Sequence, residues 1–246
     1  MNGGPVHGTW EPRPAARWED AFLCGNGRHG ALVLGDPADD RTVVTHHTLV
    51  RPDDDAGGRH RLPPLLADAL TDVQDRLLSG DLTAAEDFTD GRPLQWVRPF
   101  HPAFQIRLRH HEGAADLTGH RREVDFATGE ATARHDGRTS RVFVSRADDV
   151  IVQHVTGGDL TLRLTLDHRL PNAPGTLRVG HGAVLTPEGA LLSLRARYPG
   201  SDLAYTGVTV AAVTGGRTDL APPGVLVTGA RSILLLTRVL RHTGEA

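Results

Sequence analysis

The chain has 246 residues, of which 39% are hydrophobic and only 4% aromatic, so it is long enough to bury the core of one large domain. Its formal net charge is −3, and its 27 basic residues are all arginines scattered along the sequence without a basic stripe, so nucleic acid is not an expected partner. A single cysteine excludes an internal disulfide, and no apolar stretch reaches the roughly 18 residues that span a bilayer, so no membrane contact is expected either.

The N-terminal segment lacks the charged and then apolar pattern of a secretory signal. Because the lone Cys24 cannot form an internal disulfide, the fold must be held by packing alone, which fits a reducing compartment. We therefore expect a cytoplasmic chain that forms a single domain over residues 1–246.

The first distinctive motif is "CGNGRHGALVLGD" at residues 24–36, in which Gly25, Gly27 and Gly30 match the G-x-G-x-x-G pattern of dinucleotide-binding turns. That function requires a helix after the glycines, because the helix N-terminus receives the phosphates. Here the apolar run "ALVLGD" follows, which predicts a strand. We therefore interpret the motif as a tight turn that leads into a core strand, with Asn26 bonding the local backbone.

Between residues 62 and 90 the pattern changes from strand to helix. Leu66, Leu70, Val73 and Leu77 recur at helical spacing, and Gly80 ends the run. This spacing predicts an amphipathic helix of about four turns. We expect a helical insertion on the outside of a sheet-rich fold.

From residue 100 onward, short apolar segments alternate with Gly-rich turns, which is typical of a sandwich or barrel. Leu160, Leu162, Leu164 and Leu166 alternate with polar residues, so one face of that strand is predicted to be buried. Asp136-Gly137 and Gly157-Gly158 predict hairpin turns. The predicted fold class is mainly β: a large two-sheet antiparallel β-sandwich, supersandwich-like, with a short helical insertion at about 62–90.

The order of these features resembles the N-terminal domain of glycoside hydrolase family 95, whose members are α-L-fucosidases and related α-L-galactosidases. The opening "WEDAFLCGNGRHGALVLGD" matches the family's opening motif at Trp18, Ala21, Gly25, Asn26, Gly27, Gly30, Ala31 and Gly35. The stretches "GHRREVDFATGEATARHDG" and "RTSRVFVSRADDVIVQHVTG" extend the resemblance to about residue 157. The segment "THHTLVRP" departs from it, because His46 and His47 replace an acidic pair of the family.

In that family the β domain precedes a catalytic (α/α)6 barrel, which hydrolyses the sugar with inversion and needs no metal or organic cofactor. The resemblance thus implies a downstream catalytic barrel and a carbohydrate substrate as partners, and no catalytic residue in this chain. It places Asn26, Arg28, His29, His46 and His47 at the rim of the substrate site or at the contact with the barrel. The alternative is a free-standing carbohydrate-binding or protein-interaction module.

The remaining candidate groups favour structural roles. An inverting glycosidase needs an acid and a base roughly 6.5 to 9.5 Å apart, but the acidic clusters at Asp39-Asp40, Asp53 to Asp55 and Asp148-Asp149 are expected in solvated turns with ordinary pKa values. His46-His47 and His110-His111 suggest zinc, but neighbours on a strand point to opposite faces, so no metal site is predicted. Three tryptophans could stack on sugars or fill the core: Trp10, Trp18 and Trp96.

Overall fold

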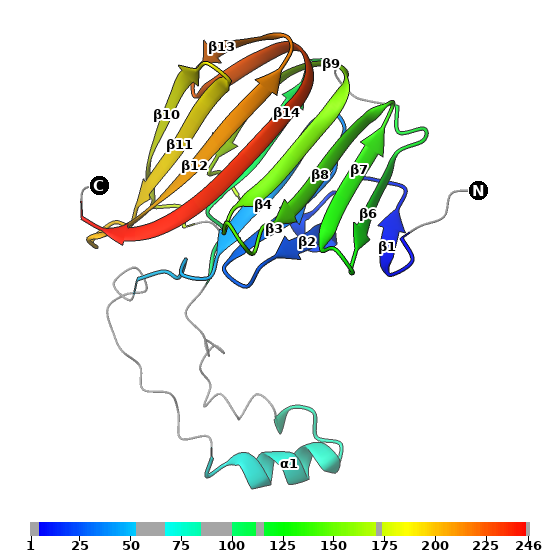
Figure 1. The fold of residues 1–246 in the computed structure, drawn as a ribbon. Coiled ribbons are helices and arrows are strands. Elements are labelled where there is room, and N and C mark those ends of the chain that lie inside the picture. The colour runs from blue at the N-terminus through cyan, green and yellow to red at the C-terminus, as the bar shows by residue number, and fades with distance from the viewer. Residues whose placement is uncertain (1–4, 53–66, 85–99, 112–115, 171–173, 245–246) are drawn as a thin grey trace. The chain divides into compact units, whose positions relative to one another are not determined.

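The computed structural model describes residues 5–52, 67–84, 100–111, 116–170 and 174–244 (Figure 1). They divide into two compact units, one of Met1–Leu49 with His101–Ala246 and the other of Val50–Phe100. The second unit contains helix α1 (Leu70–Leu78), on which Val73 is buried. A helix was predicted here and is confirmed, but it has nine residues rather than four turns. Leu66 lies outside the described residues, and the assignment of residues 1–246 to a single domain stays a prediction.

The described residues of the first unit form antiparallel strands and one 3-10 turn, η1 (Trp18–Asp20). The strands are β1 (Gly8–Glu11), β2 (Phe22–Gly25), β3 (His29–Val33), β4 (Asp39–His46), β5 (Phe104–His110), β6 (Arg121–Asp125), β7 (Glu130–His135), β8 (Arg138–Val144), β9 (Ile151–Asp167), β10 (Arg178–Thr186), β11 (Gly189–Arg197), β12 (Leu203–Thr214), β13 (Arg217–Ala221) and β14 (Gly224–Thr243). Within the described residues, no helix is long and apolar enough to cross a membrane.

The described strands form one continuous, curled 14-stranded sheet, in which two long strands, β9 and β14, join two layers that we call the first and the second sheet (Figure 1). In the first sheet the strand order is β1-β6-β7-β8-β9-β14-β12-β11-β10. The first half of β9 pairs with β8, whereas its second half pairs with β5. From β5 the second sheet continues through β4 and β3 to β2, and the first half of β14 adds β13. The same two strands thus belong to both sheets, and the predicted two-sheet antiparallel sandwich is confirmed.

The glycines of β9 show where this change of sheet happens. Gly157-Gly158 was predicted to be a hairpin turn, and this is wrong, because both residues lie inside the continuous strand Ile151–Asp167. The register between β9 and β14 shifts at this level, on either side of Ala230. The glycine pair therefore accompanies a bulge, which bends a strand and increases its twist.

The core lies between the two sheets. Leu160, Leu162, Leu164 and Leu166 are buried there, as the alternation predicted. The predicted Asp136-Gly137 hairpin is also confirmed, since both residues have positive φ (45° and 72°) between β7 and β8, as a type I′ turn requires. Burial raises the pKa of Cys24 to about 11, so this thiol is a packing group rather than a nucleophile.

Candidate functional site

The motif "CGNGRHG" forms the turn of the β2–β3 hairpin, in which Gly25 pairs with Gly30. A strand, β3, begins at His29 where a helix would be needed, so the structural turn is confirmed and the dinucleotide interpretation fails. Gly27 has φ +91°, a conformation that side chains disfavour, and a Cβ at Gly30 would lie 2.8 Å from Thr45 Oγ1. The glycines are needed for a compact hairpin.

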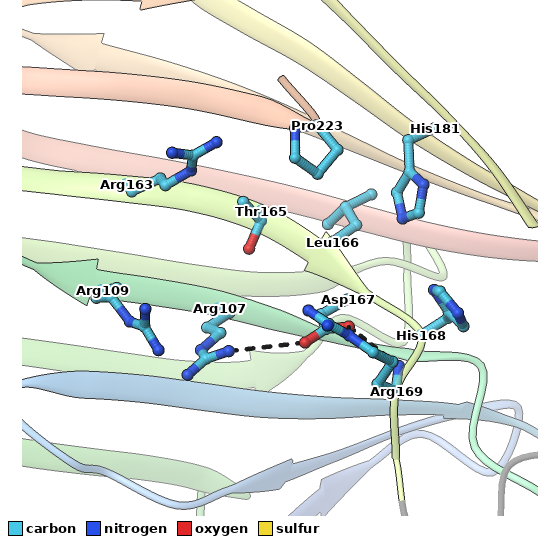
Figure 2. A pocket seen from close by; sticks show the side chains of 10 residues that line it. All are labelled: Arg107, Arg109, Arg163, Thr165, Leu166, Asp167, His168, Arg169, His181 and Pro223. Carbon is cyan, nitrogen blue, oxygen red and sulfur yellow. Dashed lines mark hydrogen bonds and ion pairs between the residues drawn. The ribbon is translucent and has the colours of Figure 1, made fainter. Parts of the chain in front are cut away.

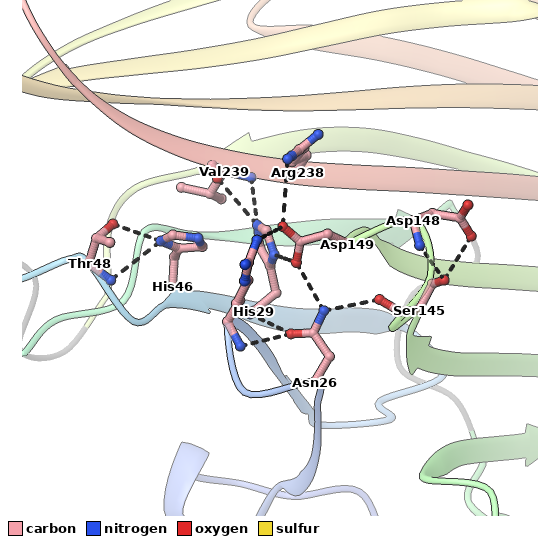
Figure 3. A network of polar contacts seen from close by, with 10 residues as sticks. Asn26, His29, His46, Thr48, Ser145, Asp148, Asp149, Arg238 and Val239 are labelled. Atoms are coloured by element: carbon pink, nitrogen blue, oxygen red, sulfur yellow. Dashed lines mark hydrogen bonds and ion pairs between the residues drawn. The ribbon is translucent and has the colours of Figure 1, made fainter.

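Asn26 ties this turn to the β8–β9 loop (Figure 3). Its Oδ1 accepts hydrogen bonds from the backbone N–H groups of Arg28 (2.9 Å) and His29 (2.8 Å). Its Nδ2 donates to the carbonyl of Ser145 (3.0 Å) and to Oδ1 of Asp149 (2.9 Å). One half-buried amide thereby fixes both the shape of the turn and its position against a loop about 120 residues away in the sequence.

His29 extends the network to β14. Its side chain is buried, with Nδ1 3.0 Å from Asp149 Oδ1, while the backbone N–H of Val239 donates to Nε2 over 3.0 Å. The pairing of β9 with β14 ends at Ile151↔Thr237, so this N–H has no ladder partner on that side. A ring with its proton on Nδ1 satisfies both contacts. The ring of His29 thus accepts the Val239 N–H hydrogen bond that a neighbouring strand would otherwise accept.

Asp149 is the centre of the network. It is one of the non-glycine residues with positive φ (54°), a conformation that aspartate tolerates better than most residues and that is retained where surrounding contacts fix it. Hydrogen bonds from Asn26 and then His29 lower the pKa of Asp149 to about 2. Arg28 (3.7 Å) and Arg238 (3.6 Å) approach its other oxygen, Oδ2. The group is an ionised anchor at neutral pH, unsuited to donate a proton.

His46 and His47 join the same region. The ring centroid of His46 lies 4.6 Å from that of His29 and 4.5 Å from that of His47. The expectation that His46 and His47 point to opposite faces is wrong, because β4 ends at His46 and strand alternation stops there. Burial, followed by the neighbouring His29, lowers the pKa of His46 to about 4, and its Nδ1 lies 2.7 Å from Thr48 Oγ1.

The structure therefore brings all five residues that the sequence predicted together at one hairpin end. Their polar atoms mainly form hydrogen bonds within the protein. Asp149 and Val239 were missed, because both are distant in sequence. Among the described residues, no group of three or more His, Cys, Asp or Glu side chains has an arrangement that could hold a metal ion. The exposed part of the network is cationic, because Arg28 and Arg238 are each more than half exposed.

The acidic clusters differ from the expectation of solvated turns with ordinary pKa values. Asp40 lies in β4 and is buried, its Oδ2 accepting hydrogen bonds from Ser140 Oγ (3.0 Å) and Gln153 Nε2 (3.1 Å). Burial raises the pKa of Asp40 to about 6, whereas hydrogen bonds lower the pKa of Asp149. Asp148 does lie in an exposed turn, bonded to Ser145, and the cluster at 53–55 lies outside the described residues.

Two of the three tryptophans can be placed. Trp10 on β1 is 49% exposed with the guanidinium carbon of Arg121 4.8 Å from its ring centroid, and Trp18 is 39% exposed. A core role is therefore wrong for both, while Trp96 lies outside the described residues. One face of the Trp10 ring is already occupied by an arginine, so it is not an open platform for a sugar.

Apolar side chains form a continuous line across the outer face of the first sheet. Each member is the direct cross-strand neighbour of the next, so all point to the same face. We call this the apolar row: Val184, Leu191, Val210, Leu236, Val152 and Phe143. It spans six adjacent strands, about 24 Å at the usual strand spacing, and four of its members are 36% to 56% exposed.

The apolar row lies beside the polar network, because Arg238 occupies the next outward position after Leu236 on β14. A line of apolar side chains that is largely exposed and has a charged border is typical of a surface that another protein or domain covers. The described residues of the first unit thus present one candidate contact surface, an apolar row with the hairpin network at its edge.

Comparison with known proteins assigns the family. The family model described as "Glycosyl hydrolase family 65, N-terminal domain" matches residues 9–240. The chain belongs to this family. The predicted N-terminal domain of a glycoside hydrolase is thereby confirmed, and the matching model is that of family 65 rather than specifically family 95.

Among solved structures, the family 65 N-terminal domain described here is similar to one titled "Putative kojibiose phosphorylase from human microbiome", with 9% sequence identity and a TM-score of 0.46. The alignment covers 100% of this chain and 35% of that one, so the chain spans about a third of the length of this relative. No match is found among curated proteins.

Proposed function

We propose that this chain is the non-catalytic N-terminal β domain of a glycoside hydrolase of the α-L-fucosidase type, and that it packs against the catalytic helical barrel of the same protein. The complete enzyme hydrolyses α-L-fucosides or α-L-galactosides with inversion, and the 246 residues alone are inactive. The enzyme is cytoplasmic and uses no metal or organic cofactor in this proposal.

The observation that carries the proposal is the apolar row. Its six members cross six strands on the outer face of the first sheet, where water otherwise meets them. Covering such a line releases water from apolar surface and stabilises the contact by about 25 cal/mol per Å² buried. A family defined as the N-terminal domain of a hydrolase makes a neighbouring catalytic domain the natural cover.

The α-L-fucosidase type is supported by the opening motif. Asn26 and Gly27 match the motif of family 95, and the structure gives each a physical task, Asn26 in fixing the hairpin and Gly27 in its positive φ. In this proposal the hairpin end with Asn26, Arg28, His29, His46 and His47 faces the barrel at the rim of the substrate site. The cationic groups Arg28 and Arg238 then border the apolar contact and supply its polar rim.

A free-standing carbohydrate-binding or protein-interaction module is the alternative. Exposed Trp10 and Trp18 favour sugar binding, but Arg121 already covers one face of the Trp10 ring. Aromatic residues are 4% of the chain, which is few for a protein that binds sugars by stacking.

The docking surface can be tested by producing this chain and the segment that its gene encodes next as separate proteins and measuring their association by analytical ultracentrifugation. We expect association that Val210→Asp with Leu236→Asp weakens at least tenfold. Leu226→Asp is the matched control, because Leu226 lies on the same strand with similar exposure but in the second sheet. Equal binding by the double variant, or a gene that encodes no further domain, would contradict the proposal.

A further inference from the structure

A cleft of about 460 Å³ opens beside the second sheet, and none of the lining residues drawn in Figure 2 belongs to the apolar row. Its lining includes two outward-facing arginines of β5, Arg107 and Arg109, and one of β9, Arg163, with Arg169 just after that strand. Arginines that are scattered in the sequence are therefore brought together at this place. Strand pairing gathers arginines that lie more than 50 residues apart in the sequence.

The arginines are arranged in a way that costs stability unless something compensates them. Arg109 and Arg163 are direct cross-strand partners, and like charges in directly opposite positions are destabilising. Arg107 is the partner of Arg41 on its other side, so a second pair of like charges lies beside the first. Such pairing is retained where a ligand or a carboxylate supplies the opposite charge.

The carboxylates of the second sheet compensate only part of this charge. Asp39 accepts two hydrogen bonds from Arg107 (2.6 and 2.7 Å), and Asp167 pairs with Arg169 (3.0 Å). Arg109 reaches Asp39 only at 4.0 Å and is 61% exposed. Arg163 has no ion pair among the described residues and donates to the carbonyls of residues 221 and 222 through one nitrogen.

Two histidines close one side of the cleft. The ring of His168 lies 5.7 Å from that of His181, and the buried Nδ1 of His168 has no hydrogen-bond partner in the part of the chain that the structure describes. Thr165, which is the cross-strand partner of Arg107, adds a hydroxyl group. Guanidinium, imidazole and hydroxyl groups around a concave site are donors for an oxyanion.

From this geometry we infer that the cleft binds a carbohydrate that carries a sulfate or phosphate ester, with the oxyanion held between Arg109 and Arg163. The volume lies within the range of small-molecule sites, roughly 300 to 1,000 Å³, so a sugar ring fits beside the anionic group. The carbohydrate part of the inference rests on the proposed function, whereas the oxyanion part rests on the arginine pairs alone.

Isothermal titration calorimetry on the 246-residue chain tests the inference with three probes: a sulfated disaccharide, the same disaccharide without sulfate, and inorganic sulfate. We expect the sulfated disaccharide to bind most tightly, and its affinity to fall about tenfold in Arg109→Gln, because a charge-assisted contact is lost. Arg163→Gln is a second variant that removes the opposite arginine. Arg141→Gln is the matched control, since Arg141 is also an exposed strand arginine but lies on β8.

Each result separates the parts of the inference. Absence of binding by all three probes, or equal weakening by the Arg141→Gln control, overturns the oxyanion site. Equal affinity for inorganic sulfate and the sulfated disaccharide overturns the carbohydrate part. Neither result changes whether a longer form of the protein hydrolyses α-L-fucosides, so failure of this inference is distinct from failure of the proposed function.

Discussion

Replacing Asn26 with alanine is expected to loosen the hairpin end from the rest of the sandwich. The side chain makes four hydrogen bonds, two accepted from the backbone of its own turn and two donated to the β8–β9 loop. Alanine removes all four and leaves Asp149 without the hydrogen bond that contributes most to its low pKa.

The size of the effect follows from the partial exposure of the site. A hydrogen bond contributes about 1 kcal/mol net, and water replaces part of what is lost at a half-buried position, so Asn26→Ala should cost about 2–3 kcal/mol. For a protein of this length, each 1 kcal/mol lowers Tm by about 2–4 °C, which gives a decrease of about 4–12 °C.

Thermal and urea unfolding followed by circular dichroism measure this difference. Arg28→Ala is the control, because its exposed guanidinium approaches Asp149 only at 3.7 Å and should contribute less than about 0.5 kcal/mol. An Asn26→Ala variant within about 0.5 kcal/mol of the native chain would refute the idea that this amide holds the hairpin in place.

Three further variants test the fold and its charges. Asp149→Asn should lower stability at pH 7, and the difference should shrink as pH falls from about 4 to about 2, since the depressed pKa of about 2 stabilises the fold only while the carboxylate is ionised; urea unfolding across this range shows it. The pKa of Asp40 is raised, to about 6, so its effect on stability has the opposite sign. The native chain should lose stability as pH rises from about 4 to about 6, because the buried carboxyl group must then ionise, and Asp40→Asn should reduce that loss in the same assay. Leu164→Ala, at a fully buried position between the sheets, should cost about 2–5 kcal/mol in urea unfolding, and a loss below 1 kcal/mol would contradict the described core.

Local patterns predicted the strands well because burial on one face leaves a period of two. The leucines at 160, 162, 164 and 166 and the Asp136-Gly137 turn are examples. The glycines at 157 and 158 were misinterpreted, since the same pair suits a turn or a bulge. Only the pairing of β9 with β14 on both sides of those glycines decides between the two, and that pairing is not visible in one sequence.

The polar network was only half predictable for the same reason. Asn26, His29 and His46 lie on one hairpin and its neighbouring strand, so a motif could find them together. Their main partners, Asp149 and Val239, are 120 and 210 residues from His29. Asp40 was expected in a solvated turn because its partners Ser140 and Gln153 are more than 90 residues away.

The most direct test of the proposed role is hydrolysis of a chromogenic α-L-fucoside by this chain, side by side with the chain extended by whatever its gene encodes next. If the sandwich supports a catalytic barrel, the extended protein is active, the 246 residues alone are not, and Val210→Asp with Leu236→Asp lowers activity of the extended form. Turnover by the 246 residues alone would contradict that account, as would an extended protein that does not hydrolyse the α-L-fucoside.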